Sequence, residues 1–382
     1  LSSTRESLSG ARVIRAFRME EAAGAEFAAR NEALTTTQKF VGKISALMNP
    51  ITYVIINAAI ILLLYTDAVQ VETGVLTQGQ VVALYNYMSQ ILIELIKMAN
   101  MIIQLTKATA CAKRIEDVLD TRAAQEWSDK TPAAAKSDDR VAFSHVSLRY
   151  AGAGADSLTD ISFTARPGET IGIIGGTGSG KSSLVQLIPR FYDATGGTVT
   201  VDGADVLSYP ADVLRGKIGF VLQRASLFHG TIRDNLKWGQ PDATDAELQY
   251  AMEQAQAGEI YASKGLDHML EQDGRNLSGG QRQRLTIARA LVRKPEILIL
   301  DDSASALDLA TDAALRKAIA EIDYHPTVFI VSQRTSSLRQ ADEILVLDDG
   351  VLVGKGTHEK LLETCDVYRE IHESQFKKEA AK

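Results

Sequence analysis

Cysteine and excess positive charge are both scarce in this sequence of 382 residues. The two cysteines, Cys111 and Cys365, lie far apart and match no metal-ligand or redox spacing, which argues against a disulfide framework and against a zinc site. Lysine and arginine number 41 against 48 acidic residues, so the net charge is −7. Because this balance provides no global basic field, a nucleic-acid-binding protein is disfavoured. At about 150 residues per domain, the length predicts two or three domains.

Charge is missing altogether from residues 44–66, which read ISALMNPITYVIINAAIILLLYT. This stretch of 23 residues exceeds the ~20 apolar residues that cross a bilayer, so it predicts a membrane span. It begins too far along the chain and is too long for the apolar region of a signal peptide. Since the sequence also begins without an initiator methionine, we expect it to be part of a longer protein.

A second predicted span, residues 81–105, carries polar side chains throughout. They recur at steps of three or four residues, which places them on one helical face. They are Asn86, Gln90, Glu94, Lys97, Asn100 and Gln104. Intramembrane charges usually face a bundle interior or a wet cavity, so one interpretation is a helix that lines a transport pathway. In the other, Glu94 and Lys97 pair while the amides hold neighbouring helices together.

The basic residues between and around these spans predict their orientation. Residues 66–80 contain no lysine or arginine, whereas residues 1–43 contain seven. The positive-inside rule therefore places both ends of the helical pair in the cytoplasm. We expect a partial transmembrane domain over residues 1–120, a polar, alanine-rich linker over residues 121–140, and a cytoplasmic domain over residues 141–382.

A glycine-rich turn, GGTGSGKS, fits the phosphate-loop pattern G-x-x-x-x-G-K-[ST]. It follows a predicted strand and opens a predicted helix, which is the context that this motif requires. The backbone N–H groups of such a loop surround phosphate oxygens, and the helix N-terminus adds positive potential. The lysine then reaches the terminal phosphates while the hydroxyl after it ligates Mg²⁺. The candidate binding residues are Gly175, Gly176, Thr177, Gly178, Ser179, Gly180, Lys181, Ser182 and Ser183.

A continuous apolar run, residues 297–300, is followed by two aspartates and is typical of a parallel strand buried on both faces. Ligands bind beyond the carboxyl ends of such strands. We therefore expect Asp301 to hold Mg²⁺ through its water shell and Asp302 to face the hydrolytic water. With the glycine loop, this predicts an α/β P-loop fold that hydrolyses nucleotides.

The sequence LSGGQRQR precedes that strand and predicts the start of a helix. Ser278 and Gln281 have the spacing of a capping box, and Gly279 and Gly280 leave the helix N-terminus open to an anion. With the glycine loop and the buried strand, this motif resembles the ATP-binding cassette (ABC) family. The two predicted spans ahead of it make the chain similar to the C-terminal part of an ABC exporter half-transporter, and the resemblance covers nearly all of it.

The resemblance implies a fold, a location and further site residues. The fold is the last two helices of an exporter bundle followed by an α/β nucleotide-binding domain with a helical subdomain, in a multi-pass protein of the cell membrane. The cofactors implied are ATP and Mg²⁺. Tyr150 matches the aromatic residue that stacks on adenine, Gln223 matches the glutamine that contacts Mg²⁺ and the membrane domain, and Asp308 matches the loop that crosses the dimer interface.

Two positions depart from the family pattern. Asp302 stands where the family has a general-base glutamate, and its carboxylate is one methylene shorter. Gln333 stands where the family has a histidine that contacts the γ-phosphate, and an amide cannot carry charge. Since misplacing a reacting group by ~1 Å costs on the order of a hundredfold in rate, we expect ATP binding to persist while turnover falls.

This pattern resembles the degenerate-site subunit of a heterodimeric exporter. The partner would be a second half-transporter subunit. Its competent site would be completed by the signature residues of this chain, Ser278, Gly279, Gly280 and Gln281. The alternative is a homodimer in which Asp302 is a working base. We expect contact with membrane lipid, a small amphiphilic or lipid-like export substrate, and no nucleic acid.

Two other functional classes fit part of the sequence. A soluble ABC ATPase acting on DNA or ribosomes has no reason to carry the charge-free stretch, and a regulatory ABC subunit without a substrate has no positive support. The C-terminal stretch, residues 356–376, is predicted to form one amphipathic helix with Thr357 as its N-cap. His358 and His372 are expected on the surface.

Overall fold

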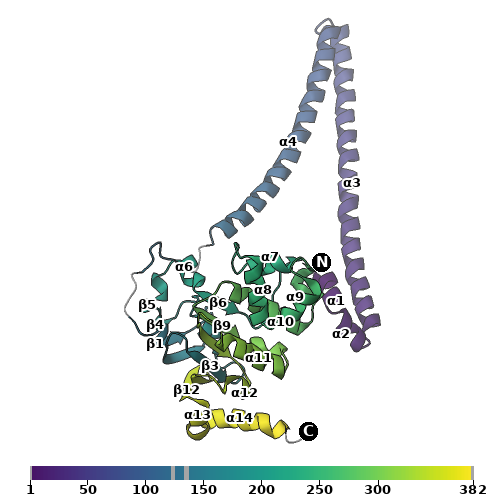
Figure 1. Ribbon diagram of the computed structural model, residues 1–382. Coiled ribbons are helices and arrows are strands. Elements are labelled where there is room, and N and C mark those ends of the chain that lie inside the picture. The colour runs from purple at the N-terminus through teal and green to yellow at the C-terminus, as the bar shows by residue number, and fades with distance from the viewer. Residues whose placement is uncertain (1, 122–124, 133–136, 380–382) are drawn as a thin grey trace. The chain divides into compact units, whose positions relative to one another are not determined.

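A computed structural model describes residues 2–121, 125–132 and 137–379. The chain divides into two compact units, Leu1–Arg122 and Ala123–Lys382. Unit 1 consists of helices among its described residues: α1 (Ser2–Ser9), α2 (Ala11–Ala16), α3 (Glu20–Glu72) and α4 (Gln78–Leu119), shown in Figure 1.

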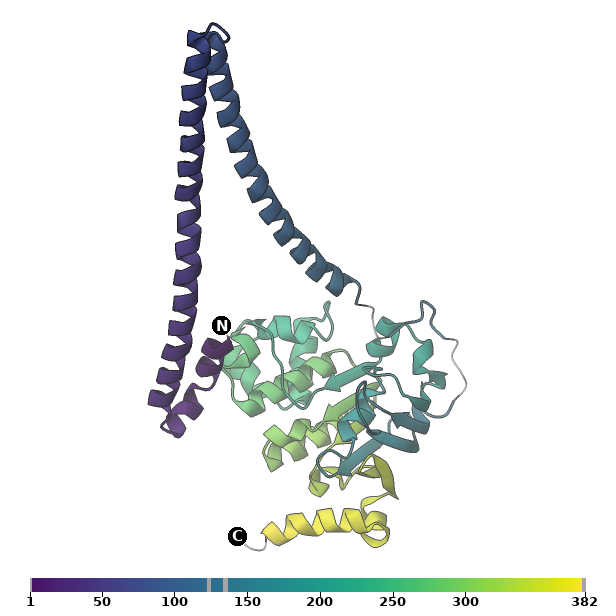
Figure 2. The same ribbon diagram turned by 180° about the vertical axis from the view of Figure 1, so that it is seen from behind.

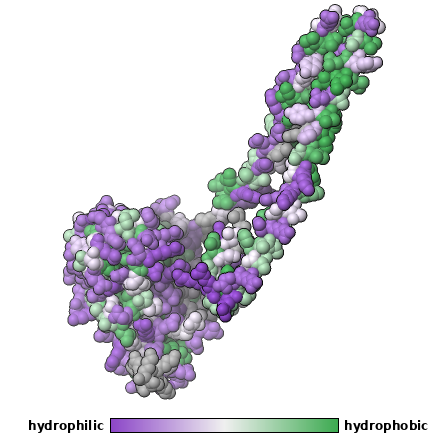
Figure 3. Space-filling view, turned by 90° about the vertical axis from the view of Figure 1, so that its right-hand side faces the viewer, coloured by the Kyte–Doolittle hydropathy of each residue, from purple (hydrophilic) through white to green (hydrophobic). Residues whose placement is uncertain are grey.

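The two long helices of unit 1 expose many large apolar side chains. Both are long and apolar enough to cross a membrane. In the most apolar 18-residue stretch of each helix, no residue is buried. Figure 3 shows hydrophobic side chains gathered along these helices. The predicted spans, residues 44–66 and 81–105, lie inside α3 and α4, which both extend beyond them. Apolar surface of this extent is stable against lipid or against further helices rather than against water.

The polar face of α4 carries a short hydrogen-bonded series. Lys97 donates a hydrogen bond of 2.8 Å to Glu94, and Gln90 donates one of 3.2 Å to the same carboxylate oxygen. Helical spacing of three and four residues brings these groups together on one side of the helix. Both interpretations of the polar stripe are compatible with this pairing.

Unit 2 is built around a six-stranded sheet with the strand order β12-β11-β3-β10-β9-β6. Its strands are β12 (Val351–Gly356), β11 (Glu343–Asp348), β3 (Thr170–Gly175), β10 (Thr327–Val331), β9 (Ile297–Asp301) and β6 (Ile218–Val221). Neighbours pair in parallel except for β12, which is antiparallel to β11. The carboxyl ends of the five parallel strands consequently meet at one edge.

A four-stranded antiparallel sheet, in the order β2-β1-β4-β5, packs with this core. Its strands are β1 (Val141–Leu148), β2 (Leu158–Ala165), β4 (Gly196–Val201) and β5 (Ala204–Asp205). A short pair, β7 (Gly230–Thr231) and β8 (Met269–Leu270), completes the strands of the described residues.

The helices of unit 2 flank the six-stranded sheet. They are α5 (Lys181–Gln186), α6 (Ala211–Gly216), α7 (Ile232–Lys237), α8 (Asp245–Gln254), α9 (Gly258–Lys264), α10 (Gly279–Val292), α11 (Leu309–Ala320), α12 (Thr335–Leu338), α13 (His358–Thr364) and α14 (Asp366–Glu379). In Figure 2, the green helices α7 to α11 lie on one side of unit 2 and the teal strands of the four-stranded sheet on the other.

Strand β9 shows why the sheet lies in the interior. All five of its residues are buried. Ile297 and Ile299 belong to the hydrophobic cluster that contains the four-stranded sheet and α5, whereas Leu298 and Leu300 belong to the cluster that contains α7 to α11. Because side chains alternate across a strand, the apolar run supplies both faces at once.

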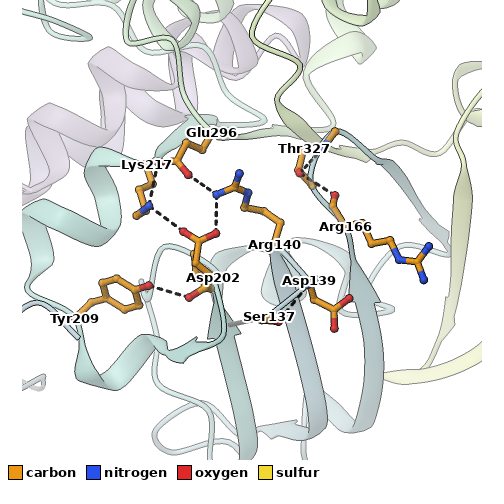
Figure 4. Close-up of polar contacts among 11 residues, drawn as sticks. Ser137, Asp139, Arg140, Arg166, Asp202, Tyr209, Lys217, Glu296 and Thr327 are labelled. Atoms are coloured by element: carbon orange, nitrogen blue, oxygen red, sulfur yellow. Dashed lines mark hydrogen bonds and ion pairs between the residues drawn. The ribbon is translucent and has the colours of Figure 1, made fainter. Parts of the chain in front are cut away.

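Four charged side chains hold the start of β9 against the four-stranded sheet (Figure 4). Arg140, just before β1, contacts Asp202 at 2.6 Å and also contacts Glu296, the residue before β9. Lys217 contacts the same two carboxylates, Asp202 at 2.8 Å and Glu296 at 3.0 Å. Each charge thus has two partners of opposite sign, and the cluster fixes the entry to the strand that ends at Asp301.

The C-terminal stretch corrects two predictions. It forms two helices, α13 and α14, because Cys365 between them has extended backbone angles. Thr357 caps α13 as predicted. His358, however, is 7% exposed, and its Nδ1 lies 2.8 Å from the hydroxyl of buried Tyr368, while His372 is half-buried. The predicted surface placement of His358 was wrong because the apolar face of α14 packs into the core.

Candidate nucleotide-binding site

The phosphate loop joins strand β3 to helix α5, which is the strand–turn–helix context that the sequence predicts. Gly180 is the N-cap of α5 and has a φ of 92°, in the left-handed region. A Cβ atom there would lie 2.7 Å from both the Ser157 carbonyl oxygen and Leu158 Cδ2. The loop therefore requires glycine at this position for both its backbone angle and its close packing.

Lys181 is buried in the loop that it follows. It is 8% exposed, and its ammonium group donates a hydrogen bond of 2.9 Å to the Gly175 carbonyl oxygen. Burial lowers the pKa of Lys181, and the charges of Asp302 and Asp301 oppose that effect. A phosphate group in the loop would add the negative charge that the buried ammonium needs.

The phosphate loop and β9 meet at a candidate metal site. The hydroxyl of Ser182 donates a hydrogen bond of 2.9 Å to Asp301 Oδ1. Asp301 is 3% exposed at the carboxyl end of β9, and burial raises its pKa. A hydroxyl and a carboxylate are hard oxygen ligands of the kind that Mg²⁺ prefers, so the two residues fit this ion. Among the described residues no group of three or more His, Cys, Asp and Glu side chains could hold a metal, so phosphates and water would complete the coordination.

Asp302 lies next to this pair in an unusual backbone conformation. Its φ is 44°, in the left-handed region. The amide of Gln223, two residues after β6, donates a hydrogen bond of 3.2 Å to Asp302 Oδ2. Burial raises the pKa of Asp302, while Lys181, Gln223 and Arg334 lower it. Gln223 and Asp302, which were predicted from widely separated motifs, are thus brought into direct contact.

Gln333 follows β10, whose Val331 pairs with Asp301 in the sheet. The backbone N–H of Asp302 donates to the Val331 carbonyl oxygen at 3.1 Å, so Gln333 begins a segment at the same sheet edge. The Gln333 side chain is exposed. The carboxyl ends of β3, β9, β10 and β6 therefore present the loop lysine, both aspartates, Gln333 and Gln223 together.

Tyr150 follows β1 and reaches the helix of the phosphate loop. Its hydroxyl donates a hydrogen bond of 2.8 Å to Ser183, and its ring packs edge-on against Tyr192 with 4.8 Å between centroids.

A cavity of about 460 Å³ opens beside α5. It is lined by Ala153, Ala155, Asp156, Ser157, Gly178, Gly180, Lys181, Ser182, Ser183, Asp349 and Gly350. Sequence reasoning missed Asp156, Asp349 and Gly350, although the Asp-Gly pair after β11 is a turn signal.

The signature residues form an exposed helix start. Ser278 is the N-cap of α10, its hydroxyl accepts a hydrogen bond of 3.2 Å from the Gln281 N–H, and Gln281 Oε1 accepts one of 3.1 Å from the Ser278 N–H. The predicted capping box is confirmed. Ser278 and Gly279 are exposed, and nothing lies within 4 Å of the Cβ position of Gly279. This N-terminus is therefore open to an anion from outside the chain.

Asp308 is the N-cap of the next helix, α11. Its carboxylate accepts hydrogen bonds from the Thr311 N–H at 2.9 Å and the Thr311 hydroxyl at 2.8 Å. The backbone hydrogen bond from Thr311 is the main cause that lowers the pKa of Asp308. An exposed, ionised cap at the start of α11 is available to a second molecule.

The chain resembles known proteins over nearly its whole length. Residues 158–305 match the ABC transporter family, and residues 1–95 match the ABC transporter transmembrane region. The chain is 42% identical over 376 residues to an ABC transporter ATP-binding protein of Mycobacterium tuberculosis, covering 97% of this chain and 64% of that protein. It is 38% identical over 372 residues to a probable multidrug resistance ABC transporter ATP-binding/permease protein of Bacillus subtilis, covering 97% and 63%.

A solved structure extends the comparison to the fold. A bacterial Atm1-family ABC exporter with ATP bound matches with a TM-score of 0.85 and 28% identity, over 97% of this chain and 66% of that one. The chain spans less than two thirds of the length of the curated relatives described above.

A helical transmembrane region followed by an α/β nucleotide-binding domain is the architecture of an ABC exporter, and this chain has both parts. Its fold matches that of an Atm1-family exporter, which confirms the predicted fold class. The chain is a multi-pass membrane protein with a cytoplasmic nucleotide-binding domain, as the distribution of basic residues predicts.

Proposed function

We propose that this chain is the ATP-binding subunit of an ABC exporter, which couples the binding and hydrolysis of ATP to the export of a substrate across the membrane. The observation that carries the proposal is the hydrogen bond between Ser182 and Asp301. It joins the phosphate loop to the end of β9 and so places the two expected Mg²⁺ ligands together. Lys181 beside them would neutralise the terminal phosphates of ATP.

The chain's own site hydrolyses ATP slowly in this proposal. The shorter side chain of Asp302 sets its carboxylate back from the attacking water, and the Gln333 amide supplies a hydrogen bond without a charge. Lys181, Ser182 and Asp301 are the groups that bind the nucleotide and Mg²⁺ in this proposal. Nucleotide therefore binds here with Mg²⁺ and turns over mainly at the other site of the assembly.

The partner is a second half-transporter subunit, most simply a different chain with glutamate and histidine at the two altered positions. Ser278, Gly279, Gly280 and Gln281 of this chain complete the partner's site, which their exposed helix start supports. The exported substrate is small and amphiphilic or lipid-like. The apolar outer surfaces of α3 and α4 contact membrane lipid.

A homodimer with Asp302 as a working base is the second candidate. Burial raises the pKa of Asp302 and so moves it towards the range in which a carboxylate accepts a proton effectively. In that arrangement both sites of the assembly are equivalent, and both depend on this residue.

One experiment separates the two. The chain is expressed in its native assembly, and ATPase activity is measured for the wild type, for Asp302→Glu with Gln333→His, and for Asp302→Asn. A degenerate site predicts that the double variant hydrolyses faster than the wild type, while Asp302→Asn changes little. The homodimer predicts near-complete loss of ATPase activity with Asp302→Asn.

Tagged purification then identifies the partner. A related second chain at one-to-one stoichiometry supports the heterodimer, and recovery of this chain alone contradicts it.

A further inference from the structure

The C-terminal helix α14 reaches the segment that carries Gln333. The amide nitrogen of Gln375 donates a hydrogen bond of 2.7 Å to the Gln333 backbone carbonyl oxygen. The amide oxygen of the same side chain accepts from the Thr335 N–H at 3.0 Å and from the Thr335 hydroxyl at 3.1 Å. One side chain from the end of the domain therefore makes three hydrogen bonds to this segment.

The opposite end of the segment is held by the phosphate-loop strand. The Ser332 N–H donates a hydrogen bond of 3.1 Å to the Ile173 carbonyl oxygen of β3. The Ser332 hydroxyl then accepts one of 3.0 Å from the Arg334 N–H and closes a local turn. The segment around Gln333 is thus hydrogen-bonded to β3 through Ser332 and to α14 through Gln375, while the Gln333 side chain is exposed.

Thr335, to which Gln375 bonds, and helix α14 itself are both held in the core. Thr335 is fully buried, and its hydroxyl lies 3.1 Å from His372 Nδ1. Tyr368 of α14 is also fully buried, belongs to the hydrophobic cluster that contains α7 to α11, and contacts His358 at 2.8 Å. A helix that is packed into the core in this way holds the residues that it contacts in fixed positions.

We infer that Gln375 is a positioning residue for Gln333: through it, helix α14 sets where the Gln333 side chain lies relative to the terminal phosphate of ATP. This inference rests on the proposed ATP-binding function. On the side of α14, the Gln375 amide donates a hydrogen bond to the backbone carbonyl oxygen of Gln333. Removing this donor leaves Gln333 free to move between Ser332 and Thr335. Contacts to the γ-phosphate depend on that residue, whereas contacts to the other phosphates come from the phosphate loop.

The variant Gln375→Glu isolates the relevant contact. A glutamate keeps the oxygen that accepts from Thr335 but loses the N–H that donates to Gln333, and it sets a carboxylate against a carbonyl oxygen. The matched control is Ser374→Ala, because Ser374 is exposed and its hydroxyl donates a hydrogen bond within its own helix, to the Ile371 carbonyl oxygen at 2.8 Å. Melting temperatures of both variants verify that α14 remains folded.

The experiment is photoaffinity labelling of this chain in its native assembly by 8-azido-ATP, with ATP or ADP as competitor and Mg²⁺ present. For Gln375→Glu we expect ATP to compete about fivefold less well, the size of one hydrogen bond, while ADP competes as in the wild type. Ser374→Ala leaves both unchanged. In a Gln333→Ala background the effect of Gln375→Glu disappears, since the positioned side chain is absent.

Each unfavourable outcome has a separate meaning. Equal weakening of ATP and ADP shows that Gln375 supports the fold only and overturns the inference. Unchanged competition by ATP at an unchanged melting temperature overturns it as well. Failure of ATP to compete in the wild type contradicts the proposed function itself.

Discussion

Ser182 and Asp301 are 119 residues apart in the sequence, and the hydroxyl of one donates a hydrogen bond of 2.9 Å to the carboxylate of the other. The contact ties the first turn of α5 to the end of β9. Both oxygens are free to turn to a divalent cation when the nucleotide brings one. We therefore expect the pair to set how much of the affinity for ATP depends on Mg²⁺.

We expect Ser182→Ala to weaken ATP binding about tenfold in the presence of Mg²⁺, because a ligand to the cation is lost. In EDTA the variant and the wild type should bind ATP alike. Equilibrium binding of ATP at matched ionic strength, with and without Mg²⁺, checks this. A tenfold loss under both conditions would mean that Ser182 contributes to the loop's shape rather than to the metal site.

Two glycines of the phosphate loop should differ sharply in tolerance. Gly180 has left-handed backbone angles and no room for a Cβ atom, whereas Gly176 has nothing within 4 Å of its Cβ position. Gly180→Ala should therefore destabilise the nucleotide-free protein by about 2 kcal/mol or more, since strain and overlap add. Gly176→Ala should leave the melting temperature nearly unchanged. Equal shifts for the two variants in thermal denaturation would contradict this account of the loop.

The ionisation of Asp302 should be visible in the stability of the nucleotide-free protein. Burial raises the pKa of Asp302, so the folded state binds its proton more tightly than the unfolded state does. The stability gained from that proton is present below the unfolded pKa of about 3.9 and is lost as the pH rises through the higher, folded pKa.

Asp302→Asn cannot ionise, so we expect it to melt at a higher temperature than the wild type at neutral pH. The difference should shrink as the pH falls and vanish below about pH 4. Melting temperatures across this range, without nucleotide, test the sign. A difference that widens on acidification would show that the folded protein favours the charged carboxylate.

Local patterns allowed most of the site to be predicted from the sequence. The capping box of Ser278 and Gln281 spans three residues, and its geometry follows from helix formation alone. The apolar run of β9 likewise indicates a strand buried on both faces, wherever it lies in the chain. In both cases the interacting groups are near neighbours, so tertiary structure has little to add.

The contacts that the sequence did not predict join elements far apart in the chain. Gln375 and Gln333 are 42 residues apart, and an amphipathic helix pattern says that α14 buries one face without saying what that face touches. The surface position predicted for His358 fails for the same reason. Neither its own residue type nor its spacing indicates that buried Tyr368 is its partner.

The predicted linker contains a docked side chain. The ring of Trp127 lies under two guanidinium groups, with the Arg190 and Arg215 carbons 4.4 Å and 4.8 Å from its centroid. Arg190 is 3% exposed and is held by Asp193 at 2.6 Å, and Gln125 donates to the same Asp193 oxygen at 3.0 Å. The segment before β1 is thus attached just beyond the helix that follows the phosphate loop.

We expect Trp127→Ala to lower the free energy of unfolding of the second unit by about 1–2 kcal/mol, because two cation–π contacts and their buried area are lost. Trp127→Phe should lower the free energy of unfolding by roughly half as much, since a smaller ring still faces both arginines. Urea denaturation followed by circular dichroism measures the difference. The sequence has two tryptophans, and Trp238 is 65% exposed, so in a Trp238→Phe background the emission of Trp127 reports the release of this segment directly. Release of the segment well before the global transition would show that the two arginines hold Trp127 only weakly and that its removal costs the domain little.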